Sequence, residues 1–159
     1  MEKLGWDDPI PDTIAADFRN FAAELPALKE FRVNRSYSTL RRTYDSDCLI
    51  GFCDASERAY CAIIYLRRII DNSVTINFVV AKTKVAPIKQ LNDGGANTIP
   101  KLELQAALLL ATLAERVAKL FQINFDKIYI FSDSTVVLAW IRNLAIKQPV
   151  YVQNCVVKI

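Results

Sequence analysis

The sequence predicts an α/β domain with a mixed sheet, and two observations carry this prediction. Three β-rich runs follow one another from Cys48 with only short polar turns between them, a pattern typical of an antiparallel meander. A long apolar run with the length of a helix comes next, followed by a short apolar run and a second helical stretch. A strand reached through a helix usually lies parallel to an earlier strand, so the order β-β-β-α-β-α adds one parallel crossover to the meander.

The composition fits one domain with a short appendage. Hydrophobic residues make up 52% of the 159 residues and charged residues 23%, which supports a core and excludes wholesale disorder. The first residues are polar and proline-marked, unlike a secretory signal, and the apolar runs are too short to span a bilayer. We therefore expect a soluble intracellular protein. The net charge of +3 says little about a partner.

The absence of histidine restricts the chemistry that the chain can perform. Its four cysteines show no CxxC spacing, so a structural zinc site is not expected, and we predict buried, reduced thiols. Serine–histidine and cysteine–histidine catalysis are excluded within the chain. Acid–base or metal chemistry must then fall to carboxylates, lysines or tyrosines.

Residues 1–45 differ in sequence pattern from the rest of the chain and are predicted to form a connector. Asp12 or Thr13 can cap a helix whose apolar residues recur at helical spacing, and Pro26 should end it. An amphipathic helix ahead of the main fold suggests a segment that packs against something. The main domain is expected over 46–159.

The strands of the meander open the main domain. We expect them over 48–53, 59–69 and 74–84. Arg67 and Arg68, near the end of the second strand, should be exposed, as most arginines are.

The second half of the main domain should alternate helix and strand. The helix over 100–120 has Thr98 as its expected cap and is apolar nearly all round, so it should lie against the sheet. A buried strand at 127–132 should pair with 48–53, because both are apolar runs of the kind that central strands require. Further helices are expected from residues 134 and 149.

Three acids mark the predicted site. Asp54 and Asp133 each follow a strand, and the carboxyl ends of parallel neighbours lie side by side, where functional groups of open α/β sheets gather. Glu103, expected in the first turn of the intervening helix, can lean toward the same edge. Crowded carboxylates repel one another unless a cation joins them, and oxygen-only clusters suit Mg²⁺ or Mn²⁺. Two such ions can promote phosphodiester hydrolysis.

Each acid also has a simpler explanation. Asp133 can serve as the N-cap of the following helix, and Asp54 can belong to a turn. Glu103 in a first turn is favoured by the helix dipole. The joint placement of all three at one sheet edge favours function.

Several stretches resemble the ribonuclease H-like domain of BEL/Pao-type retrotransposon polyproteins. They are "GFCDASERAYCAIIYLR", "AKTKVAPIK", "TIPKLELQAALLLATLAERV" and "IYIFSDSTVVLAWIR". The segment "GWDDPIP" resembles the connection between the reverse transcriptase and this domain. The resemblance spans nearly the whole chain, and its motifs are long and ordered.

The resemblance implies an RNase H-like fold with a mixed five-stranded sheet flanked by helices. It also implies metal-dependent cleavage of the RNA strand of RNA–DNA hybrids, with the three family acids at Asp54, Glu103 and Asp133. A fourth acid of such folds comes from a helix beyond an additional strand, and this sequence ends at Ile159 before that region. The implied domain is therefore truncated, with its C-terminal strand and helix missing.

The cofactor and partners follow from the same resemblance. It implies Mg²⁺ or Mn²⁺, no small-molecule cofactor and no membrane. The implied partners are an RNA–DNA hybrid and the reverse transcriptase domain of the same polyprotein, within a cytoplasmic virus-like particle.

Polar residues near the acids are candidates for nucleic-acid contact. Lys82, Lys84 and Lys89 are expected in the loop before the long helix, where they contact phosphates or are simply solvated. Ser56 and Ser134 flank the acids and can bond a carboxylate or a ribose 2′-hydroxyl, although Ser134 is also placed to cap a helix.

Two other functions are compatible with part of this pattern. A catalytically inactive RNase H-like module can bind nucleic acid or scaffold a polymerase, and the truncated end favours it. A phosphotransfer enzyme with Asp54 as nucleophile fits less well, since such folds place a helix after the first strand of a parallel sheet.

Overall fold

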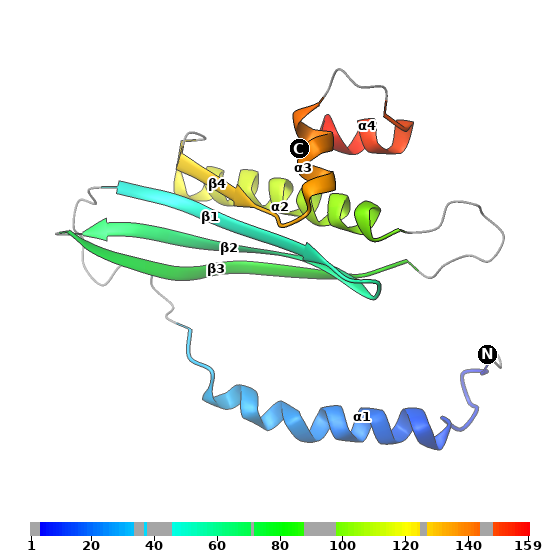
Figure 1. Ribbon diagram of the computed structural model, residues 1–159. Helices are drawn as coiled ribbons and strands as arrows, with labels where there is room; N and C mark the ends of the chain where they lie inside the picture. Colours follow the sequence, from blue (N-terminus) through cyan, green and yellow to red (C-terminus); the bar gives the residue numbers. More distant parts are fainter. Residues whose placement is uncertain are drawn as a thin grey trace. The chain divides into compact units, whose positions relative to one another are not determined.

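The computed structural model describes residues 4–33, 37, 46–70, 72–87, 98–124, 127–143 and 148–159. The chain divides into two compact units, Met1–Tyr37 and Ser38–Ile159. The domain boundary that the sequence predicts between residues 45 and 46 adjoins residues 38–45, which lie outside the described residues. Figure 1 shows the elements of each unit.

The first unit contains the predicted amphipathic helix. Helix α1 spans Asp12–Glu24 and the 3-10 helix η1 spans Leu25–Glu30. The α-helix ends at Glu24, before Pro26, as expected, and the chain continues as η1 with Leu25 still in helical geometry. No residue of α1 is buried, and its apolar side chains are exposed, among them Phe18 at 68%.

The second unit is built on a mixed four-stranded sheet, as predicted. The strands are β1 (Ser46–Ala55), β2 (Ala59–Ile70), β3 (Ser73–Val85) and β4 (Ile128–Phe131). Their order is β3-β2-β1-β4, with β1 antiparallel to β2, β2 antiparallel to β3, and β1 parallel to β4 (Figure 1). The meander and its single crossover are therefore confirmed.

Helix α2 (Ile99–Phe121) covers one face of this sheet, as its nearly continuous apolar surface predicted. The core lies between them and includes the fully buried Leu49, Ile64, Leu66, Leu104 and Leu110. Gly51 lets the helix approach β1 closely, because a Cβ atom at this position would lie 2.7 Å from Leu110 Cδ1.

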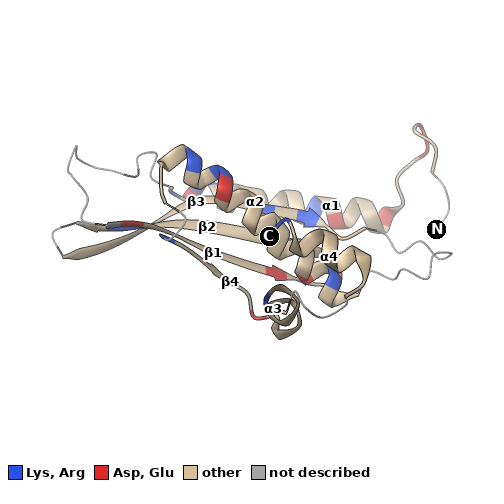
Figure 2. Cartoon of the chain, turned by 90° about the horizontal axis from the view of Figure 1, so that it is seen from above, with Lys and Arg blue, Asp and Glu red and all other residues tan. Residues whose placement is uncertain are grey.

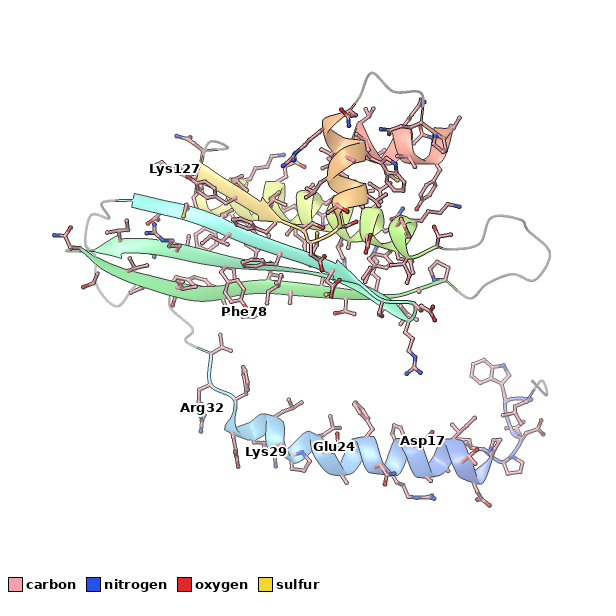
Figure 3. The ribbon with its side chains drawn as sticks, viewed as in Figure 1. Asp17, Glu24, Lys29, Arg32, Phe78 and Lys127 are labelled. Carbon is pink, nitrogen blue, oxygen red and sulfur yellow. The ribbon has the colours of Figure 1, made fainter. Side chains whose placement is uncertain are left out.

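The opposite face of the sheet carries a row of aromatic rings from all four strands. Phe52 stacks on Phe131 with centroids 5.4 Å apart, and edge contacts join Phe52 to Tyr65 and Tyr65 to Phe78. Phe78 points away from α2 in Figure 3. We call this surface the open face, because among the described residues of the second unit no helix packs on it.

The prediction that the strand at 127–132 is buried was wrong. Strand β4 is the outer strand of the sheet that the structure describes, and Tyr129, Ile130 and Phe131 are 45–52% exposed. Its pairing with β1 is confirmed. An apolar composition suits a central strand, but it does not by itself supply a neighbour on both sides.

Two short helices complete the second unit, near their predicted positions. They are α3 (Thr135–Arg142) and α4 (Val150–Val156). Helix α4 contacts α2 through Gln105, whose side-chain amide lies 2.5 Å from the Tyr151 hydroxyl. Among the described residues, no helix is long and apolar enough to cross a membrane. The expected further strand and helix beyond Ile159 stay a prediction.

Two burial predictions need correction. Arg68 is buried, because its side chain pairs with Asp47 at 3.2 Å on the helix-covered side of the sheet. Cys61 is exposed, whereas Cys48, Cys53 and Cys155 are buried and all four thiols are free. Cys61 is paired with Asp54 at the carboxyl end of β1, on the side that α2 does not cover.

Candidate active site

Two of the three predicted acids lie at equivalent positions on neighbouring parallel strands. Phe52 of β1 pairs with Phe131 of β4, and each is followed two residues later by an aspartate, Asp54 or Asp133. Asp54 lies within β1, so its side chain points to the same side as Phe52, that of the open face. Asp133 lies two residues beyond the end of β4, at the same edge of the sheet. Both are exposed. Figure 2 shows acidic residues at the end of β1 and directly before α3.

Glu103 reaches this edge from α2. The helix begins at Ile99, so Glu103 is in its second turn, and the expectation of a first-turn position was wrong. Because the effect of the helix dipole falls off within the first turn, it does not account for this residue. Glu103 is half-buried between Leu102 and Leu104, which are both buried.

A hydrogen bond joins Glu103 to the residue that follows Asp133. The hydroxyl of Ser134 donates to Glu103 Oε2 and accepts from the backbone N–H of Val137 at 3.3 Å. Ser134 is thus the N-cap of α3 and is only 6% exposed. The alternative in which Asp133 caps this helix was wrong.

The buried thiol of Cys53 reports on the charges around it. Burial raises its pKa above the ordinary value, a hydrogen bond with the side chain of Ser132 lowers it, and the charges of Asp133 and Asp54 raise it. Both aspartates are therefore close enough to Cys53 to act on its ionisation. Cys53 directly precedes Asp54 on β1 and points to the opposite side of the sheet.

The oxygen ligands of the three acids suit a hard cation, although the structure does not gather their carboxylates into one metal-binding group. Asp54, Glu103 and Asp133 offer only oxygen ligands, which Mg²⁺ and Mn²⁺ prefer. Within the described ranges, no group of three or more acidic, cysteine or histidine side chains has the spacing needed to hold a metal ion. Asp54 points to the open face from β1, whereas Glu103 belongs to α2, which covers the opposite face of the sheet.

The remaining candidates lie apart from one another. Lys82 and Lys84 are exposed residues of β3, as the strand expected over 74–84 implies, and the placement of both in the loop before α2 was wrong. Lys89 falls outside the described residues. The Ser56 hydroxyl donates to the carbonyl of Ala59 at 3.2 Å and accepts from two backbone N–H groups, so it shapes the turn between β1 and β2. Nucleic-acid contact by these residues and by Ser134 stays a prediction.

The sequence suggested that Ser134 caps a helix or bonds a carboxylate or a ribose 2′-hydroxyl, but it did not identify Glu103 as the carboxylate. The capping signal was readable, because serine precedes an apolar helical run. The bond was not readable, since it depends on how closely α2 and α3 approach one another.

A comparison with protein-family models identifies a match that covers most of the chain. The model described as Pao retrotransposon-like RNaseH-like domain matches residues 1–134, which contain all three acids and end at Ser134. No curated protein and no solved structure matches the chain.

Proposed function

Because the chain belongs to the Pao retrotransposon-like RNaseH-like domain family, we propose that it is a retroelement ribonuclease H that hydrolyses the RNA strand of RNA–DNA hybrids. The mixed sheet of the structure is consistent with an RNase H-like fold. The observation that supports catalysis is the parallel pairing of β1 with β4, in which Asp54 and Asp133 each follow a paired phenylalanine by two residues.

The three carboxylates would hold Mg²⁺ or Mn²⁺ at this edge. Such ions supply an activated water and stabilise the leaving oxygen of a phosphodiester. Asp54 and Asp133 are exposed, so they are accessible to a nucleic-acid backbone, and Glu103 supplies the third carboxylate from α2. In-line cleavage at an RNA phosphodiester then leaves a 5′-phosphate and a 3′-hydroxyl.

The substrate and its context follow from the family. A retrotransposon module of this kind meets nucleic acid within a polyprotein, and we propose an RNA–DNA hybrid as substrate and the reverse transcriptase domain as neighbour. Lys82 and Lys84 are exposed cations on β3 that can contact phosphates without reading sequence. The proposed location is the virus-like particle in the cytoplasm.

The direct test is cleavage of a labelled RNA–DNA hybrid by the purified chain with Mg²⁺ or Mn²⁺. Loss of an outer partner of a metal ligand typically costs 10–100-fold in affinity or activity, so Asp54→Asn and Asp133→Asn should each lower cleavage by at least about 100-fold. Glu115→Gln is the matched control, because this exposed acid of α2 pairs with Lys119 away from the site. Cleavage that survives Asp54→Asn contradicts the assignment.

A second candidate is a non-catalytic module that binds hybrid or scaffolds a polymerase. The family match is equally compatible with a nucleic-acid-binding module of a retrotransposon. Calorimetry distinguishes the two, since only the nuclease requires Mg²⁺ binding that Asp54→Asn abolishes. A chain that binds hybrid but neither binds Mg²⁺ nor cleaves supports the scaffold.

A further inference from the structure

Ser134 connects helices α2 and α3 at the candidate site. Its hydroxyl accepts from the N–H of Val137 and donates to Glu103 Oε2. A serine hydroxyl has a single proton, and a backbone N–H can only donate. The hydroxyl proton is therefore directed at the carboxylate, and the Glu103 side chain is the acceptor.

Ser134 is itself held firmly in place. Its backbone N–H donates to the Ser132 hydroxyl at 3.2 Å, and its side chain caps the first turn of α3. A long glutamate side chain loses considerable rotamer freedom when it is fixed, so an anchored donor defines its position. The bond engages Oε2, and Oε1 is outside it.

We infer that Ser134 is a positioning residue that orients the Glu103 carboxylate toward the edge where Asp54 and Asp133 lie, and this inference rests on the proposed function. Ser134 is 6% exposed and its hydroxyl proton is directed at Glu103, so the inference assigns this hydroxyl to Glu103 in place of the predicted contact with a substrate ribose. Fixed hydrogen-bond partners of this kind set the orientation of metal-binding carboxylates.

Three variants separate positioning from capping. Ser134→Gly removes the hydroxyl, and glycine is an acceptable N-cap, so α3 should remain folded. Ser134→Thr keeps both the hydroxyl and the cap. Thr112→Val is the matched control, because it removes a hydroxyl that bonds to the Leu108 carbonyl within α2.

A double-mutant cycle tests the bond without any metal. Urea unfolding in metal-free buffer is measured for Ser134→Gly, for Glu103→Ala, which removes the acceptor, and for the double variant. The two changes should be non-additive, because residues in contact couple, whereas Ser134→Gly and Thr112→Val should add. Additivity of Ser134→Gly with Glu103→Ala overturns the inference.

Metal uptake tests the orientation itself. Mn²⁺ binding to the full chain, followed by the loss of the free-ion electron paramagnetic resonance signal, should weaken about tenfold in Ser134→Gly and recover in Ser134→Thr. In hybrid cleavage, kcat should fall while KM is unchanged, whereas a substrate contact would raise KM. A wild-type chain that takes up no Mn²⁺ overturns the proposed function. Equal uptake by wild type and Ser134→Gly overturns the positioning role alone.

Discussion

At the scale of single residues, the two cysteines beside Asp54 have opposite environments. Cys53 is buried and burial raises its pKa, whereas Cys61 is exposed. Only the thiolate is nucleophilic, so the Cys53 thiol needs a higher pH to react. We expect a thiol reagent to modify native Cys61 first, with Cys53 reacting more slowly and at higher pH.

The reaction with a chromogenic disulfide reagent measures this difference. Cys61→Ser should remove the fast phase, and Cys53→Ser should leave it unchanged. A fast phase that survives Cys61→Ser would show that a thiol assigned to the core is accessible.

The buried pair of Arg68 and Asp47 is a second residue-scale feature. Their side chains are 9% and 23% exposed, and Asp47 Oδ1 has no hydrogen-bond partner in the described part of the chain. Arg68→Ala removes the cation and leaves a largely buried carboxylate. Because Asp47 keeps some contact with water, the free energy of unfolding should fall by about 2 kcal/mol, less than for a fully buried pair.

Urea unfolding measures this loss, and a second substitution identifies its cause. Adding Asp47→Leu to Arg68→Met should recover part of the stability, since replacing both members of a buried pair is often neutral or favourable. Lys119→Ala, which breaks an exposed pair on α2, should change little. If the double variant has a lower free energy of unfolding than Arg68→Ala, the uncompensated charge of Asp47 is not the cause of the lost stability.

At the scale of elements, the approach of α2 to β1 depends on Gly51. A methyl group there would lie 2.7 Å from Leu110 Cδ1, and Leu110 is fully buried and cannot turn outward. Gly51→Ala should therefore destabilise the chain by about 1–3 kcal/mol, the usual cost of overpacking.

Chemical unfolding followed by circular dichroism measures this cost. Gly5→Ala is the control, because its added methyl meets only the exposed Asp8 side chain, and it should cost less than about 0.5 kcal/mol. If Gly51→Ala and Gly5→Ala lower the free energy of unfolding equally, the loss comes from replacing a glycine and not from a clash between α2 and β1.

The elements themselves were largely predictable from the sequence. Short polar turns and the change from strand to helix periodicity locate the meander, α2 and β4, and the crossover rule pairs β4 with β1. The cap of α3 was less certain, because Asp133 and Ser134 are both good capping residues and only the local backbone selects Ser134. The turn that holds Glu103 depends on a helix start that sequence locates only approximately.

At the scale of the whole molecule, the sequence predicts which strands meet but not which surfaces remain uncovered. The apolar residues of β4 and of the open face are equally compatible with a central strand or an outer one. In the same way, sequence places three acids at one edge, whereas their spacing depends on how the helix and sheet layers pack. The exposure of these surfaces and the spacing of the three acids both depend on three-dimensional contacts, which the periodicity of the sequence does not encode.

The open face predicts a measurable surface property. On β3, Val74, Ile76 and Phe78 pair with alternate residues of β2 on this side, and Val74 and Ile76 are 52% and 62% exposed. Contiguous exposed apolar surface of this kind binds hydrophobic dyes and promotes association. Val74→Thr combined with Ile76→Thr should lower fluorescence of a naphthalene-sulfonate dye while costing less than about 1 kcal/mol, because threonine keeps the branched shape that strands favour.

The control for this prediction is Val85→Thr at the far end of β3. Val85 is 82% exposed and has no part in the aromatic row, so its substitution should leave dye binding unchanged. Dye fluorescence and the unfolding midpoint are measured on the same samples, so that a loss of fluorescence is separated from a change in folding. If the double variant binds as much dye as wild type, the open face is not the exposed apolar surface that the dye detects, and the contribution of β3 to it is refuted.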